Sequence, residues 1–139
     1  MMTTNIHSSL ENISDIAKKL KETLPKNCII FLNGTLASGK TTLTKAIVRE
    51  FDNLEPVTSP TFSLQNIYGN NLFHYDLYMV NFDEIINLGL YEEFDKPGWH
   101  IVEWADDKLK AFLESAGYNT FNITINIVNS NSREYILGA

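Results

Sequence analysis

The sequence contains only one cysteine, and this scarcity excludes a disulfide framework within the chain. Cys28 begins a short apolar run, where a buried and unreactive thiol is more common than a nucleophile or a metal ligand. The chain has 139 residues, of which 44% are hydrophobic, so it can bury a core without disulfides or a structural metal. We therefore expect a single domain spanning residues 1–139, and a reducing compartment is allowed.

Long hydrophobic stretches are also missing. No segment approaches the roughly 18 apolar residues that a membrane-spanning helix requires. Residues 1–12 are polar, and they lack the basic segment and apolar core of a secretion signal. These features predict a soluble, cytoplasmic protein without a membrane partner.

Basic residues are scarce as well. Eleven lysines and arginines face seventeen aspartates and glutamates, which gives a formal net charge of −6. A protein that binds nucleic acid by itself neutralises many phosphates with positive side chains. The negative balance therefore predicts that any role with RNA or DNA depends on a partner protein.

Hydrophobic periodicity divides the chain into alternating helices and strands, without an internal repeat or an obvious linker. Apolar residues at three- and four-residue intervals predict helices over 11–24, 40–51 and 105–115, and a capping box at Asn81 and Glu84 opens a short helix that ends near Gly89. Apolar runs and period-two alternation predict strands over 28–32, 61–68, 72–79, 99–104, 120–128 and 133–137. The pattern indicates an α/β fold with a mixed parallel and antiparallel sheet flanked by helices.

The segment from Gly34 to Thr41 matches the Walker A pattern G-x-x-x-x-G-K-[ST], and the fold class is therefore that of a P-loop NTPase. In such a loop, backbone N–H groups point at phosphate oxygens and the N-terminus of the next helix adds partial positive charge. We expect Lys40 to reach the β- and γ-phosphates of ATP and the Thr41 hydroxyl to bind Mg²⁺. The predicted nucleotide-binding residues are Gly34, Leu36, Ala37, Ser38, Gly39, Lys40, Thr41, Thr42 and Thr61.

Two acidic residues within or at the end of short apolar strands are candidates for holding the metal. Glu103 ends the run that begins with residues 100–102 in one predicted strand, and Asp76 lies inside another. Carboxylates in such positions are rare unless they are paired or bind a ligand. Both are therefore predicted to act in catalysis with Lys40, and the sequence leaves open which of them contacts Mg²⁺. Asp106 and Asp107 lie in the first turn of a predicted helix, where the helix dipole is a sufficient explanation.

Several other residues near these motifs allow two interpretations. Residues 58–62, Thr-Ser-Pro-Thr-Phe, are either a proline turn or a switch segment whose hydroxyls, including that of Thr61, sense the γ-phosphate. His74 and His100 are more typical of buried strand histidines than of catalysts. Trp104 is either a core residue or a contact for a partner protein.

The order and spacing of these motifs resemble the TsaE family, the bacterial ATPases of tRNA threonylcarbamoyladenosine biosynthesis. The matching segments are 34–42, 58–62, 74–78, 88–92 and 102–104, and the resemblance as a whole extends over nearly the whole chain. The resemblance implies a P-loop ATPase that works with TsaB and TsaD proteins to modify the adenosine beside the anticodon, and that reaches tRNA through this complex. It also implies a switch role for the segment 58–62 and functional roles for Asp76, Glu103 and Trp104.

Two sites in the chain differ from the family's pattern. Ala37 and Ser38 stand where the family loop usually carries Gly-Ala, and Met79 stands where an arginine usually follows the tyrosine. The second difference removes a positive charge near the partner or phosphate surface, so we expect another basic residue to replace it.

The preferred mechanism is that ATP binding orders residues 58–62 into a docking surface, and that slow hydrolysis then resets the partner complex. No basic residue is placed by the sequence as an arginine finger, so slow turnover is expected unless a partner completes the site. Two alternatives remain: a small-molecule kinase, for which the sequence shows no arginine-rich lid, and a nucleotide-gated binding module without meaningful hydrolysis. A GTPase is disfavoured, because no N-K-x-D segment is present.

Overall fold

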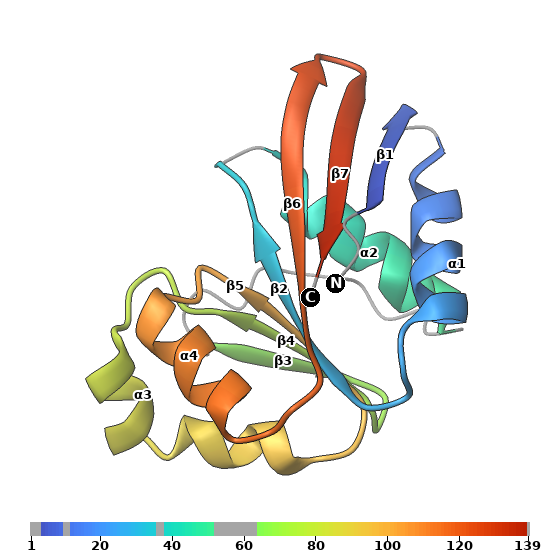
Figure 1. Cartoon of the computed structure of the whole chain (residues 1–139). Helices are drawn as coiled ribbons and strands as arrows, with labels where there is room; N and C mark the ends of the chain where they lie inside the picture. Colours follow the sequence, from blue (N-terminus) through green and yellow to red (C-terminus); the bar gives the residue numbers. More distant parts are fainter. Residues whose placement is uncertain (1–3, 10–11, 36–37, 52–63, 139) are drawn as a thin grey trace.

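The computed structural model describes residues 4–9, 12–35, 38–51 and 64–138. Within these residues, seven strands form one mixed sheet in the order β1-β7-β6-β2-β5-β4-β3, and helices cover its two faces (Figure 1). In chain order the elements are β1 Thr4–Ser9, α1 Ile13–Thr23, β2 Cys28–Asn33, α2 Lys40–Glu50, β3 Gln65–Tyr68, β4 Leu72–Asp76, α3 Phe82–Asn87, the 3-10 helix η2 Leu90–Asp95, β5 Trp99–Glu103, α4 Asp107–Ser115, β6 Thr120–Asn129 and β7 Ser132–Gly138.

The centre of the sheet is parallel. Strand β2 pairs in parallel with both β5 and β6, and β4 pairs in parallel with β5. In this register Glu103, the last residue of β5, lies opposite Leu32 of β2 and Asp76 of β4. The carboxyl ends of three strands therefore meet at one edge of the sheet, where α2 also begins.

The two faces of the sheet bury separate apolar clusters, because side chains along a strand alternate between faces. Helices α1 and α2 cover one face and α3, η2 and α4 cover the other (Figure 1). Strand β2 contributes Ile30 and Leu32 to the first cluster and Ile29 and Phe31 to the second. The prediction of a strand buried on both faces is confirmed. Among the described residues, no helix is long and apolar enough to cross a membrane.

Most predicted elements are confirmed, including the β3–β4 hairpin, and one strand was missed. Residues 4–9 form β1, which pairs antiparallel with β7 along its whole length. Ile6 is the only strongly apolar residue in this segment, so no alternation was visible in the sequence. The strand exists because an edge of β7 is available for main-chain hydrogen bonds, and that edge is far away in the sequence.

The predicted strand over 72–79 was too long, since β4 ends at Asp76. The side chain of Asp76 turns back on the chain, and its Oδ1 accepts a hydrogen bond from the backbone N–H of Tyr78 at 3.1 Å. This side-chain turn replaces strand pairing. The predicted strand over 61–68 is described only from residue 64 onward, and β3 begins at Gln65. The 3-10 helix η2 was also not predicted.

Candidate functional site

The segment 34–41, which comprises the connection from β2 to α2 and the first two residues of α2, is called the glycine loop below. Both of its glycines are required by the backbone. Gly39 has a φ of +109°, a conformation that side chains rarely adopt. At Gly34 a Cβ atom would lie 2.5 Å from Ser38 Oγ and 3.0 Å from the carbonyl oxygen of Ile125. Gly34 therefore lies close to both Ser38 and β6, with no room for a side chain.

Lys40 opens α2, and its ammonium group curls back over the glycine loop. Its Nζ donates hydrogen bonds to the carbonyl oxygens of Gly34, at 2.8 Å, and Thr35, at 3.1 Å. Burial lowers the pKa of Lys40, and the nearby carboxylates of Glu103 and Asp76 oppose that change. The structure thus brings together the three residues that were predicted to act in catalysis.

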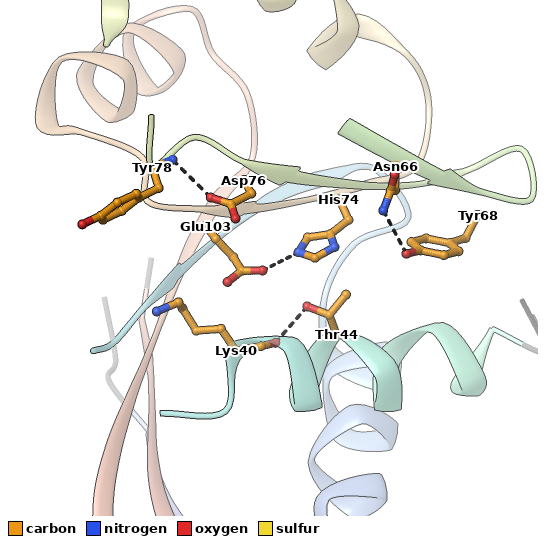
Figure 2. Close-up of polar contacts among 8 residues, drawn as sticks. All are labelled: Lys40, Thr44, Asn66, Tyr68, His74, Asp76, Tyr78 and Glu103. Atoms are coloured by element: carbon orange, nitrogen blue, oxygen red, sulfur yellow. Dashed lines mark hydrogen bonds and ion pairs between the residues drawn. The ribbon is translucent and has the colours of Figure 1, made fainter. Parts of the chain in front are cut away.

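Glu103 is held by a histidine. Its side chain is buried, and Oε2 lies 2.5 Å from Nε2 of His74 (Figure 2). Because a carboxylate accepts, Nε2 of His74 donates this hydrogen bond. Nδ1 of His74 is buried and has no hydrogen-bond partner among the described residues. His74 is a buried strand histidine, as predicted, but its contact with Glu103 was not foreseen.

Asp76 lies beside Glu103 in the pairing of β4 with β5, and it is half-buried. In the part of the chain that the structure describes, no group of three or more His, Cys, Asp or Glu side chains could hold a metal ion alone. A metal at this edge would need further oxygen ligands, which Mg²⁺ commonly takes from a hydroxyl, phosphates and water. Thr41 is half-buried in the first turn of α2 and offers such a hydroxyl. The donor set of carboxylate and hydroxyl oxygens therefore fits Mg²⁺.

Trp104 follows β5 in the left-handed conformation, with a φ of +62°. The centre of its ring lies 4.1 Å from Lys40 Nζ, a cation–π contact, and 5.0 Å from the ring of Tyr78. Trp104 is only half-buried, Tyr78 beside it is 59% exposed, and Met79, which follows Tyr78 in the chain, is 70% exposed. Its ring is therefore part of the site and borders an exposed apolar surface.

Some of the predicted site lies outside the described residues. This applies to Leu36 and Ala37 of the glycine loop and to the whole segment 58–62, with Thr61. Their predicted roles stay predictions. Thr42 is exposed in the first turn of α2.

Three residues have the structural roles that were expected of them. Burial raises the pKa of Cys28 to about 12, so its thiol is unreactive. Asp106 caps α4, since its Oδ1 accepts a hydrogen bond from a backbone N–H in the first turn at 2.8 Å. His100 is buried between the hydroxyl of Tyr75, at 2.6 Å, and the carbonyl oxygen of Lys96, at 2.8 Å.

Arg133 on β7 was missed as a candidate. Its Nε donates a hydrogen bond to the carbonyl oxygen of Ser38, in the glycine loop, at 2.9 Å. The side chain is buried, with 8% exposed. A signal existed in the sequence, because alternation puts Arg133 on the same strand face as Tyr135, and a charge on an inward face calls for a partner.

These features define the chain as a mixed α/β protein whose glycine loop, between a strand and a helix, holds a lysine against two carboxylates at the carboxyl edge of the sheet. A family model described as Threonylcarbamoyl adenosine biosynthesis protein TsaE matches residues 7–135. The chain belongs to the TsaE family, as the sequence resemblance indicated, and thus to a family of tRNA threonylcarbamoyladenosine biosynthesis.

Individual relatives agree with this assignment, and each carries the name tRNA threonylcarbamoyladenosine biosynthesis protein TsaE. The protein from Nostoc sp. is 35% identical over 112 residues, which are 76% of this chain and 69% of the relative. The protein from Bacillus subtilis is 31% identical over 131 residues, or 86% and 82% of the two chains. The crystal structure of Bacillus subtilis YdiB aligns with a TM-score of 0.67 and 24% identity over 100% of this chain and 88% of that one, which supports the fold.

Proposed function

We propose that this protein is a P-loop ATPase that binds ATP with Mg²⁺ and supports tRNA N6-threonylcarbamoyladenosine modification. The observation that carries the proposal is the convergence of Lys40, Glu103 and Asp76 at the glycine loop. A lysine on a tight backbone loop, beside two acids and at a helix N-terminus, is the arrangement that binds a triphosphate and its metal. Family membership supplies the biological process.

Binding of ATP is supported by the two hydrogen bonds of Lys40. Its ammonium donates to carbonyl oxygens of the glycine loop, and the β- and γ-phosphate oxygens of ATP are stronger acceptors that replace them. The first-turn amides of α2 add further donors. Thr41 and one of the two acids, Glu103 or Asp76, would hold Mg²⁺, which offsets phosphate charge when it is bound.

Hydrolysis is supported by the way Glu103 is held. His74 fixes Oε2 by a hydrogen bond of 2.5 Å, so the carboxylate keeps one orientation, and its second oxygen orients the attacking water. Lys40 offsets charge on the phosphates, while the guanidinium of Arg133 is engaged with carbonyl oxygens. No free arginine of the described chain faces the site as a finger, so turnover is slow until a partner contributes one.

Partners of the TsaB and TsaD type are proposed to complete the assembly. The half-buried ring of Trp104 and the exposed side chains of Tyr78 and Met79 offer them an apolar contact beside the nucleotide site. In this scheme the segment 58–62, with Thr61, responds to the γ-phosphate. The tRNA is reached through the complex, because the chain carries a formal charge of −6.

Calorimetry of ATP binding with and without Mg²⁺ tests the nucleotide site. Lys40→Ala removes one charge-assisted interaction with phosphate, which is worth about 1.5–3 kcal/mol, so affinity should fall by about 10- to 100-fold. Lys45→Ala is the matched control, because it removes the same group from the exposed side of the same helix. The proposal fails if the unmodified protein shows no magnesium-dependent affinity, or if Lys40→Ala binds as tightly as Lys45→Ala.

A second assay separates an ATPase from a nucleotide-gated binding module. Glu103→Gln keeps the size of the side chain but removes the charge that orients water, so single-turnover hydrolysis should fall while ATP binding persists. In the ATPase interpretation this variant fails to support the tRNA modification in cells. Normal modification by a variant that cannot hydrolyse ATP would favour the binding module instead.

A further inference from the structure

We infer that Arg133 is a positioning residue for the glycine loop: from strand β7 it fixes the peptide between Ser38 and Gly39 and adds positive charge beside the polyphosphate. This inference rests on the proposed nucleotide site and assigns it a residue from the far end of the chain. Arg133 lies outside the Gly34–Thr41 motif and outside the pair of acids.

The contacts of Arg133 join two distant parts of the chain. Nε donates to the carbonyl oxygen of Ser38 at 2.9 Å, across a sequence separation of 95 residues. Nη1 donates to the carbonyl oxygens of Asn129, at 2.7 Å, and Ser132, at 2.9 Å, both at the turn of the β6–β7 hairpin. The hairpin therefore holds the guanidinium in place, and the guanidinium holds the loop.

The direction of this hydrogen bond determines where the loop's next donor points. The carbonyl of Ser38 and the N–H of Gly39 belong to one peptide unit, and in a trans peptide these two groups point in opposite directions. With the carbonyl oxygen fixed toward Arg133, the Gly39 N–H is directed away from the hairpin. A donor on the carbonyl also polarises the N–H of the same peptide and strengthens it as a donor.

The charge of Arg133 is not balanced by an acid. Within the described residues, no carboxylate forms an ion pair with it, and the neighbouring Glu134 pairs with His7 instead. A buried cation with only carbonyl acceptors is unfavourable, and an anion nearby offsets that cost. Nε lies 4.0 Å from the position that a Cβ of Gly39 would occupy, so the uncompensated charge lies beside the peptide that precedes Lys40.

A guanidinium is suited to this task and an ammonium is not. The planar fork of Arg133 donates from Nε to the loop and from Nη1 to the hairpin at the same time. A lysine at this position keeps the charge but presents its donors from a single atom on a flexible stem. Arg133→Lys therefore keeps the charge but loses the hydrogen-bond geometry, whereas Arg133→Met loses both.

The test measures MgATP affinity and its salt dependence for Arg133→Met and Arg133→Lys. Arg49→Met is the matched control, because Arg49 is exposed on α2. We expect Arg133→Met to weaken affinity about tenfold or more and to flatten its dependence on salt, as one charge near the phosphates is lost. Arg133→Lys should retain the salt dependence of the unmodified protein but bind several-fold more weakly, and Arg49→Met should bind normally.

Unfolding by urea is measured on the same samples, because a purely structural role would lower stability and leave the affinity of the folded protein unchanged. Unaltered affinity and salt dependence in folded Arg133→Met overturns the inference. If Arg133→Met does not fold, the test rests on Arg133→Lys. An MgATP affinity of Arg133→Lys within twofold of that of the unmodified protein would then overturn the inference. Failure of the unmodified protein to bind MgATP at all would instead refute the proposed function, so the two failures are distinguishable.

Discussion

At the scale of single residues, two buried histidines on neighbouring strands have different tasks because of their partners. His74 on β4 donates to the carboxylate of Glu103 at the carboxyl edge of the sheet. His100 on β5 is stacked on Phe73, with ring centroids 4.4 Å apart, and bonds to Tyr75 and the Lys96 carbonyl. One histidine therefore orients a group of the candidate site, and the other completes the core.

The burial of His100 leads us to predict that the stability of the protein depends on pH. Burial lowers the pKa of His100 from its ordinary value of 6.5, with smaller opposing effects from the Lys96 carbonyl and Glu93. The folded state therefore resists protonation, whereas the unfolded chain takes up a proton as the pH falls below about 6.5. Stability contributed by neutral His100 is present above this pH and is lost on acidification, by up to about 1.4 kcal/mol per pH unit.

His100→Gln removes the titrating imidazole and replaces it with an uncharged amide that can still donate and accept hydrogen bonds. Urea unfolding at a series of pH values between 7.5 and about 5 should show a shallower loss of stability for this variant than for the unmodified protein. The quantity compared is the difference in the free energy of unfolding between the variant and the unmodified protein at each pH. All other titrating groups are the same in the two proteins, so their contributions cancel. If the free energy of unfolding falls equally with pH in both proteins, His100 is not responsible for the pH dependence of stability.

Single residues of the candidate site differ in how far the sequence could predict them. Lys40 is fixed by a local motif, and Glu103 and Asp76 are noticeable as charges in apolar strands. The contact of His74 with Glu103 and that of Arg133 with Ser38 depend on strand register across 29 and 95 residues. Local patterns carry no information about register between distant strands, so these contacts could not be predicted.

At the scale of elements, prediction succeeded where the signal was local. The capping box of α3 is present as expected, with Asn81 accepting from the Glu84 N–H at 2.9 Å and Glu84 accepting from the Asn81 N–H at 3.3 Å. Strand β1 was missed for the opposite reason, because its existence depends on the free edge of β7. Mixed sheets with long-range pairing therefore limit prediction more than helices do.

Helix α4 allows a test of whether an acid near the site is structural. Asp106 caps α4 through a 2.8 Å hydrogen bond to the Leu109 N–H, and it is exposed. Asp106→Ala should cost about 1 kcal/mol of unfolding free energy, whereas Asp106→Asn retains the cap acceptor and should cost less. Urea denaturation measures both values. MgATP affinity should be the same in both variants, and a loss of affinity in Asp106→Asn would instead make this carboxylate part of the site.

At the scale of the whole molecule, sheet order explains why one edge carries the site. Strand β2 lies between β5 and β6, with β4 on the far side of β5, and the carboxyl ends of β2, β4 and β5 lie together. Open α/β sheets bind ligands outside the carboxyl ends of their strands. The glycine loop supplies the helix N-terminus at this edge, Glu103 and Asp76 supply the acids, and β7 supplies Arg133.

The distribution of charge over the molecule leads to a prediction about tRNA. Lys40 and Arg133 are buried at the glycine loop together with one acid, Glu103, so the remaining charged residues are one unit more acidic than the formal charge of −6. Such a surface repels the phosphate backbone, and counterion release provides little affinity. Filter binding of labelled tRNA at about 0.15 M salt should therefore show little retention by the isolated protein, with or without MgATP.

In the proposed assembly, the same assay with TsaB and TsaD present should retain the tRNA, because these proposed partners would have to supply the positive surface. Leaving MgATP out of the mixture with all three proteins is the control that shows whether this protein's nucleotide site governs the assembly. Tight, salt-sensitive binding of tRNA by the isolated chain would mean that a basic surface forms locally despite the acidic balance. In that case the chain would contact the nucleic acid directly, and its partners would not be needed to reach it.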